Sequence, residues 1–204
     1  MFRHEQKREK AIHTAGRRNN VEIVEYLLDQ KNIELNDNAL ISCEKLREIK
    51  IPSNIISIKE GLFRSCKSLR KVSLPESLET IEKMAFYCCT SLKEITIPSS
   101  VQSIGESSFE KCSQLIQVTI MSSSIKSISD RCFCDCSSLV KFITKSPLES
   151  IGENAFYGCE SLLYAANLSS AKSIGYLAFY NCSKLENVTL SPSLESIGSS
   201  SFEG

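Results

Sequence analysis

The feature that most constrains this chain is a phrase that returns about every 23 residues. The segment "SIGENAFYGCESL" (150–162) comes back as "SIGYLAFYNCSKL" (173–185), "TIEKMAFYCCTSL" (80–92) and "SIGESSFEKCSQL" (103–115). Seven of the ten cysteines keep this interval, with one step of 24: Cys43, Cys66, Cys89, Cys112, Cys136, Cys159 and Cys182. One cysteine per unit is not the framework of a small disulfide-bonded domain. The repeat instead indicates a repeat architecture, in which each unit is one structural element of a larger array.

Each repeat holds one segment with the alternation of a half-buried strand, such as "LRKVSLP" (69–75) or "LKEITIP" (92–98). An Ile column and a Phe column accompany the cysteines: Ile58, Ile81, Ile104, Ile128, Ile151, Ile174 and Ile197, and Phe63, Phe86, Phe109, Phe133, Phe156, Phe179 and Phe202. A unit of this length cannot bury its own apolar face, whereas stacked units can. The sequence therefore predicts an α/β repeat solenoid with one parallel strand per coil and short convex turns or helices.

The pattern "IPxSVxSIGExxFxxCxxL", present at 97–115, resembles the BspA-like class of leucine-rich repeats. The resemblance covers residues 36–204 and implies a solenoid of about seven coils. The resemblance also implies a function like that of surface antigens and adhesins of bacteria and protists, namely attachment to cells or binding of host proteins. The last segment, "SPSLESIGSSSFEG" (191–204), stops one residue before the next expected Cys, which predicts a truncated C-terminus.

Residues 1–35 differ from the repeats. The segment "AIHTAGRRNNVEIVEYLLDQKNIELN" (11–36) has helical spacing at Val21, Val24, Leu27 and Leu28. It resembles one ankyrin repeat, in which His13 takes the position of the ankyrin histidine. We expect an ankyrin-like helical hairpin that caps the first unpaired edge of the solenoid.

Charge and hydropathy exclude several classes of partner. Lys and Arg number 24, and so do Asp and Glu, so the formal net charge is zero. A nucleic-acid binder or a protein held on an anionic membrane needs a sustained positive field. No apolar run approaches the roughly 20 residues of a transmembrane helix, and no apolar segment of a signal peptide follows the charged N-terminus. Localisation stays open. The family resemblance favours the cell surface, whereas the missing signal peptide favours the cytoplasm.

The sequence offers little material for catalysis. Its two histidines are His4 and His13, and a structural role explains His13. Gly105, Gly152, Gly175 and Gly198 occupy one repeat position, which indicates turn glycines and no phosphate loop. We expect no enzyme activity and no cofactor.

The cysteine cluster "RCFCDCSS" (131–138) does not have a common zinc spacing, so no metal site is predicted. Cys132 aligns with alanines of other repeats and Cys136 belongs to the ladder. Cys88 and Cys134 fall in columns of polar residues, which predicts two accessible thiols. Stacked coils are close enough for disulfides, but an unbroken column favours buried, reduced thiols.

Residues between the inward positions of the strands are expected on the concave surface, where they are candidates for partner binding. The first coils present charged residues there and the middle coils apolar ones: Arg47, Arg70, Lys71 and Lys93, then Val140, Ile143, Leu163, Tyr164 and Ala166. An exposed apolar cluster of this kind marks an interaction site. Because Thr144 and Asn167 fill inward positions, a slip of one residue would instead turn Ile143 and Ala166 inward.

The sequence thus predicts a non-catalytic module that recognises a protein through its concave sheet, and the family resemblance implies an extracellular or host protein as the partner. The alternative is an intracellular scaffold or regulator that combines ankyrin and leucine-rich repeats, which reduced thiols and a missing signal peptide would favour.

Overall fold

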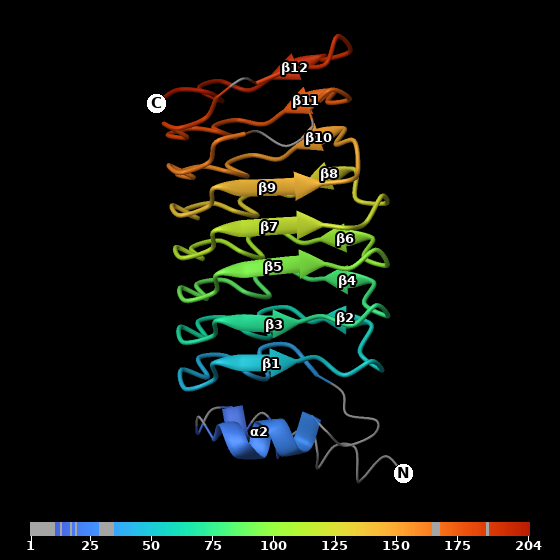
Figure 1. Ribbon diagram of the computed structural model, residues 1–204, viewed down its shortest axis with the longest axis vertical. Helices are drawn as coiled ribbons and strands as arrows, with labels where there is room; N and C mark the ends of the chain where they lie inside the picture. Colours follow the sequence, from blue (N-terminus) through green and yellow to red (C-terminus); the bar gives the residue numbers. More distant parts are fainter. Residues whose placement is uncertain are drawn as a thin grey trace.

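In the computed structural model, which describes residues 11–12, 14–16, 18, 20–28, 35–164, 168–186 and 188–204, each repeat forms one coil of a parallel-strand solenoid. The coils stack along one axis (Figure 1). One side carries the strands that we call the front sheet: β1 (Glu48–Lys50), β3 (Lys71–Ser73), β5 (Glu94–Ile97), β7 (Gln117–Ile120) and β9 (Lys141–Thr144). They pair in parallel as β1–β3 and β5–β7–β9.

The front strands form because buried and exposed residues alternate along them. β5 reads exposed, buried, exposed, buried, and its inward residues Ile95 and Ile97 lie opposite Val118 and Ile120 of β7. Equivalent residues of successive repeats are therefore register partners. The expected parallel strand of each of these coils is confirmed.

A second strand of two residues follows in each coil, at the Ile column, and the prediction of one strand per coil had omitted it. These strands are β2 (Ser57–Ile58), β4 (Thr80–Ile81), β6 (Ser103–Ile104), β8 (Ser127–Ile128), β10 (Ser150–Ile151), β11 (Ser173–Ile174) and β12 (Ser196–Ile197). They form the sheets β2–β4–β6 and β8–β10–β11–β12. Two residues are too few to show an alternation in sequence.

The break between β6 and β8 lies in the coil with the step of 24 residues. Its extra residue falls in the loop "MSSS" (121–124), where the preceding coil has "PSS" (98–100). Elsewhere an N–H of the next coil donates to the Ile carbonyl, as Gly152 does to Ile128 at 2.8 Å. At the break the Ser129 hydroxyl donates to the Ile104 carbonyl instead, at 2.6 Å. A side chain thus keeps this carbonyl paired where the sheet is interrupted.

The third side of each coil consists of turns linked by a ladder of backbone hydrogen bonds. Asn154, Phe156 and Gly158 donate to the carbonyls of Tyr176, Ala178 and Tyr180 at 2.8–2.9 Å. The ladder needs a left-handed φ at two positions per coil, such as Asn154 with φ 53° and Gly158 with φ 69°. Most of these positions hold a residue other than glycine. The four glycines of the repeat position have a different role. A Cβ on Gly175 would lie 2.6 Å from backbone atoms of Gly152 and Glu153.

The core is a set of continuous columns. The rings of Phe63 through Phe202 stack on one another at centroid distances of 5.1–5.4 Å. Phe142 of β9 packs edge-on against Phe133 and Phe156 at 5.3 and 5.0 Å. The Leu column beside them is fully buried from Leu46 to Leu162. Because the same side chains meet in coil after coil, each coil completes the core of its neighbour.

At the N-terminal end, α2 (Val21–Leu28) lies beyond β1 (Figure 1), and Asn20 accepts a hydrogen bond from the Ile23 N–H at 3.2 Å as its N-cap. Ile12, Ala15, Val24 and Leu27 are buried in the same cluster as the first coils. These contacts agree with a helical cap, whereas the ankyrin resemblance stays a prediction. His13, on which that resemblance partly depends, lies outside the described residues.

Candidate interaction surface

The front sheet presents a column of side chains that runs the length of the stack, at right angles to the strands. We call it the front column: Arg47, Arg70, Lys93, Ile116, Val140, Leu163 and Glu186. Each residue after Arg47 donates its N–H to the carbonyl of the one before, at distances between 2.7 and 3.5 Å. The column is therefore continuous along the stack, and its side chains lie at the spacing of parallel strands, about 4.8 Å.

The N-terminal half of this surface is charged. Arg47, Arg70, Lys71 and Lys93 are all exposed, as expected for residues between the inward apolar positions. Glu48 lies opposite Lys71 in the β1–β3 register, so the column beside the front column alternates in sign. Within the described residues, the ion pairs of the structure do not include Arg47, Arg70 or Lys93. These three cations are free to meet an external anion.

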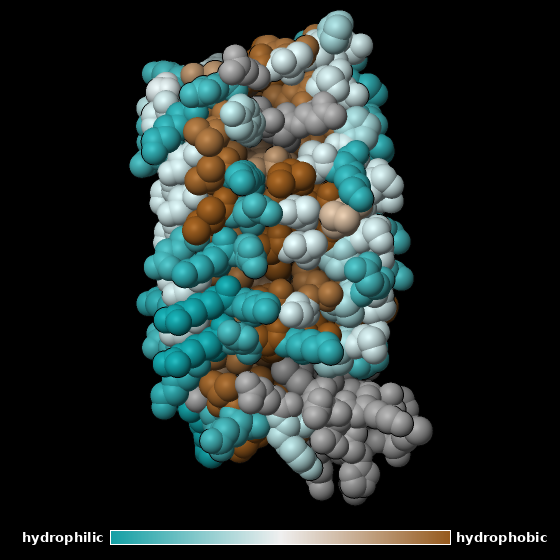
Figure 2. All heavy atoms as spheres, in the orientation of Figure 1, coloured by the Kyte–Doolittle hydropathy of each residue, from teal (hydrophilic) through white to brown (hydrophobic). Residues whose placement is uncertain are grey.

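From Ile116 to Leu163 the front column is apolar, with the exposed Lys141 of β9 beside it. Exposed fractions are 48% for Ile116, 46% for Ile143 and 58% for Tyr164, while Val140 and Leu163 are half-buried. We call these five residues the apolar patch; Ile116 is the member that the predicted cluster did not contain. Ala166, which that cluster did contain, lies outside the described residues. Figure 2 shows hydrophilic residues gathered over β1, β3 and β5, whereas over β7, β9 and the coils above them hydrophobic residues lie among hydrophilic ones.

The register of β9 decides whether Ile143 faces outward. Lys141, Phe142, Ile143 and Thr144 pair with Gln117 through Ile120 in unbroken order. Phe142 points inward with 7% exposed, and the hydroxyl of the half-buried Thr144 accepts from the Ser146 N–H at 3.1 Å. The slip of one residue does not occur in this strand, because Phe142 fills the inward position and Thr144 satisfies its hydroxyl locally.

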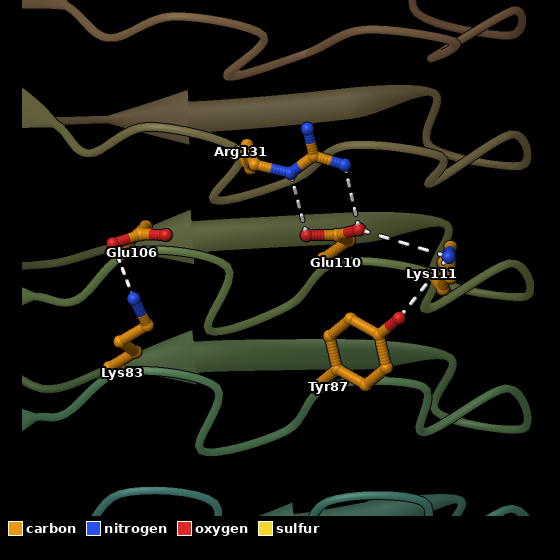
Figure 3. Close-up of polar contacts among 6 residues, drawn as sticks. All are labelled: Lys83, Tyr87, Glu106, Glu110, Lys111 and Arg131. Carbon is orange, nitrogen blue, oxygen red and sulfur yellow. Dashed lines mark hydrogen bonds and ion pairs between the residues drawn. The ribbon is translucent and has the colours of Figure 1, made fainter.

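A second polar feature lies on the turn side, where charged residues link successive coils (Figure 3). Glu110 is buried and receives two hydrogen bonds from Arg131, both at 3.1 Å, while Lys111 reaches the Tyr87 hydroxyl at 3.2 Å. Burial alone would raise the pKa of Glu110, but the hydrogen bonds from Arg131 and Ser107 hold that pKa below its usual value. Every charge in this cluster is paired with a neighbouring side chain. The cluster therefore links successive coils and offers no unpaired charge to a ligand.

The ladder thiols act as hydrogen-bond donors as well as apolar side chains. The Sγ atoms of Cys89, Cys112 and Cys136 lie 3.1–3.2 Å from the carbonyl oxygens of Phe63, Phe86 and Phe109. Burial raises the pKa of Cys66 and Cys182 to about 12. In this structure the ten cysteines form no disulfide with one another.

The prediction of two accessible thiols is half wrong. Cys88 is half-buried, but Cys134 is only 3% exposed and lies close enough to the paired Glu110 and Arg131 to interact with them electrostatically. Burial raises the pKa of Cys134 to about 12. Cys132 contacts the Ser108 hydroxyl at 3.3 Å and Cys136 contacts a carbonyl, so the cluster has separate partners. Among the described residues no group of three or more His, Cys, Asp or Glu side chains could hold a metal ion.

A hollow of about 370 Å³ at the last coil is lined by Phe179, Cys182, Ser183, Leu185, Val188, Leu190, Phe202 and Gly204. These residues include no carboxylate, imidazole or amine that could act as a general acid or base. No helix in the described ranges has the length and apolar composition needed to cross a membrane.

The repeat columns, the short parallel strands of the coils and the open front sheet define a class of protein, the leucine-rich-repeat solenoids. The sequence matches the BspA type Leucine rich repeat region over residues 33–163 and 118–204. The chain belongs to this family, whose fold is typically a non-catalytic scaffold. No curated protein matches the sequence.

Three solved structures are similar to the solenoid. A leucine-rich repeat protein from Eubacterium ventriosum has a TM-score of 0.71 and 28% identity over 80% of this chain and 44% of its own. One from Bacteroides ovatus has a TM-score of 0.59 and 25% identity over 82% and 55%. A leucine rich cell surface protein from Faecalibacterium prausnitzii has a TM-score of 0.53 and 25% identity over 83% and 54%. This chain spans about half the length of these proteins.

Proposed function

We propose that the chain recognises a protein partner through its front sheet, without catalysis. The observation that carries the proposal is the apolar patch, in which Ile116, Ile143 and Tyr164 expose nearly half or more of their surface on one face. Exposed apolar side chains that gather on one face mark an interaction site, and Tyr is enriched among the residues that dominate binding energy. The family supports a protein-binding repeat module.

Surface display, with a role in attachment, is supported by the relative from Faecalibacterium prausnitzii, which is a cell surface protein. The alternative is an intracellular scaffold. It is supported by the reduced state of the ten cysteines, since disulfides are rare in proteins of reducing compartments. Both placements use the same front sheet for recognition.

Site-specific photo-crosslinking tests the proposal. A benzophenone amino acid replaces Tyr164 in the source cells, and in a control strain it replaces Tyr176, which lies beyond β11, away from the front sheet, with a similar exposed fraction of 48%. We expect irradiation to join a second protein to position 164 and not to position 176. Equal crosslinking at both positions, or none at position 164, would contradict the proposal.

A further inference from the structure

The front column changes character halfway along the stack, and this change specifies the partner's chemistry. We infer that the front column binds an extended polypeptide segment with a block of acidic side chains next to a block of apolar ones. The segment lies across the strands, with its acidic block over Arg47, Arg70 and Lys93 and its apolar block over Ile116, Val140 and Leu163. The inference rests on the proposed function and adds the identity of the ligand.

The first argument is the arrangement of the three cations. Arg47, Arg70 and Lys93 are successive members of one ladder, joined by backbone hydrogen bonds of 2.7 Å and 3.5 Å. Like charges on neighbouring strands repel one another, and none of the three has an ion-pair partner among the described residues. A row of carboxylates along the column would remove this repulsion and gain charge-assisted hydrogen bonds.

The second argument is the direction in which the chemistry changes. The next column alternates, with Glu48, Lys71 and Glu94 in successive coils, so it offers no row of one sign. Only along the front column do three cations precede three apolar side chains. A ligand that follows this order must run along the stack and not along any one strand.

The third argument is length. Three neighbouring strands span about 10 Å, and an extended chain advances about 3.3–3.4 Å per residue, so each block of the ligand needs about three or four residues. An anionic polysaccharide would carry charge along its whole length. It would leave Ile116 and the half-buried Val140 and Leu163 without an apolar partner, which favours a polypeptide.

A display library of random 12-residue peptides, selected on the immobilised full chain, tests the inference. The first variant is Arg47→Glu/Arg70→Glu/Lys93→Glu, and the second is Leu163→Ser/Tyr164→Ala. The matched control is Lys67→Glu/Lys126→Glu/Lys184→Glu, which makes the same change of charge at exposed lysines outside the front column. Fluorescence anisotropy then gives the Kd of each selected peptide for the four proteins.

We expect selected peptides to carry adjacent acidic and apolar blocks, in either chain direction. Their Kd should rise at least tenfold in the first variant, at least fivefold in the second and less than threefold in the control. Added salt should weaken binding to the wild-type chain, because exposed ion pairs are screened.

Three results would overturn the inference, and they have different consequences. Peptides that lose affinity in the second variant but carry no acidic block would refute the bipartite ligand and leave the proposed function standing. Peptides that bind both variants as well as the wild-type chain would refute both. A heparin-derived octasaccharide that binds more tightly than every selected peptide, and only when Arg47, Arg70 and Lys93 are present, would replace the polypeptide with a glycan.

Discussion

The interior columns and the front column are made by the same coils, yet they vary in opposite ways. Phe63 through Phe202 keep one residue type and one stacking distance from coil to coil. The front column changes from Arg and Lys to Ile, Val and Leu and ends at Glu186. The interior side chains must fit those of the next coil, while the outward side chains of the front column face solvent. The comparison teaches that the interior columns carry the fold, and that the front column is free to carry recognition.

The largest effect on stability is expected in the Phe column. Phe133→Ala removes a ring that stacks on Phe109 and Phe156 at 5.4 Å and meets the edge of Phe142. We expect a loss of about 3–5 kcal/mol in the free energy of unfolding, measured by urea denaturation. A loss below 1 kcal/mol would show that this column does not hold the coils together.

The next effect tests the close approach of two coils. Gly175→Ala places a Cβ 2.6 Å from backbone atoms, whereas Gly158→Ala meets mainly the Asp135 carboxylate and a left-handed φ of 69°. We expect Gly175→Ala to cost about 2–3 kcal/mol and Gly158→Ala about 1–2 kcal/mol. Thermal denaturation of the pair gives the order, and a larger cost at Gly158 would refute this account of the repeat glycine.

The buried carboxylate gives a smaller, pH-dependent effect. Because the pKa of Glu110 is lowered in the folded state, its contribution is present above the unfolded pKa and is lost as pH falls through the folded one. Arg131→Met should therefore cost about 1–3 kcal/mol at pH 7, and this difference should shrink below about pH 4. Urea denaturation of both proteins at pH 7 and at pH 3.5 measures it. A difference independent of pH would show that Arg131 acts through packing alone.

Thiol accessibility sharpens the comparison without changing stability. The half-buried Cys88 should react with an aromatic disulfide reagent at pH 8, while the nine buried thiols should react only on unfolding. Cys88→Ser should remove the fast phase. Rapid reaction of Cys134 would contradict the burial of this thiol beside Glu110 and Arg131.

The front sheet should show the smallest effect on stability. Tyr164→Ala shortens a side chain that is exposed and does not pack in the core. The free energy of unfolding should therefore change by less than about 0.5 kcal/mol. Tyr176→Ala is the control at similar exposure. A loss above 1.5 kcal/mol for Tyr164→Ala alone would mean that this residue belongs to the fold.

The repeat made much of this predictable from sequence. The inward Leu, Ile, Phe and Cys columns follow from the fixed interval between coils, and the outward Arg47, Arg70, Lys71 and Lys93 follow from their places between inward apolar residues. Tyr164 and Ile143 were expected outward for the same reason. Register pairing shows that the alternation in β9 holds through Thr144, which sequence left open.

Other features depend on contacts between coils that a single repeat does not display. Cys134 has polar neighbours in its column, yet it is buried beside a carboxylate and a guanidinium that pair between adjacent coils. The Ser129 hydroxyl replaces a backbone donor only because an extra residue in 121–124 precedes it. The hydrogen bonds of the ladder thiols to Phe carbonyls also depend on the spacing of neighbouring coils. A column read in sequence gives the direction of a side chain and not the atoms that it meets.

The most direct test of recognition by the front sheet is to measure affinity and stability on the same variant. The protein crosslinked at position 164 is titrated by calorimetry into the wild-type chain, Leu163→Ser/Tyr164→Ala and Tyr176→Ala, and each melting temperature is recorded. The account predicts a Kd at least tenfold higher for the double variant alone, with its melting temperature lowered by no more than about 4 °C. An unchanged Kd in the double variant, with the fold intact, would contradict it.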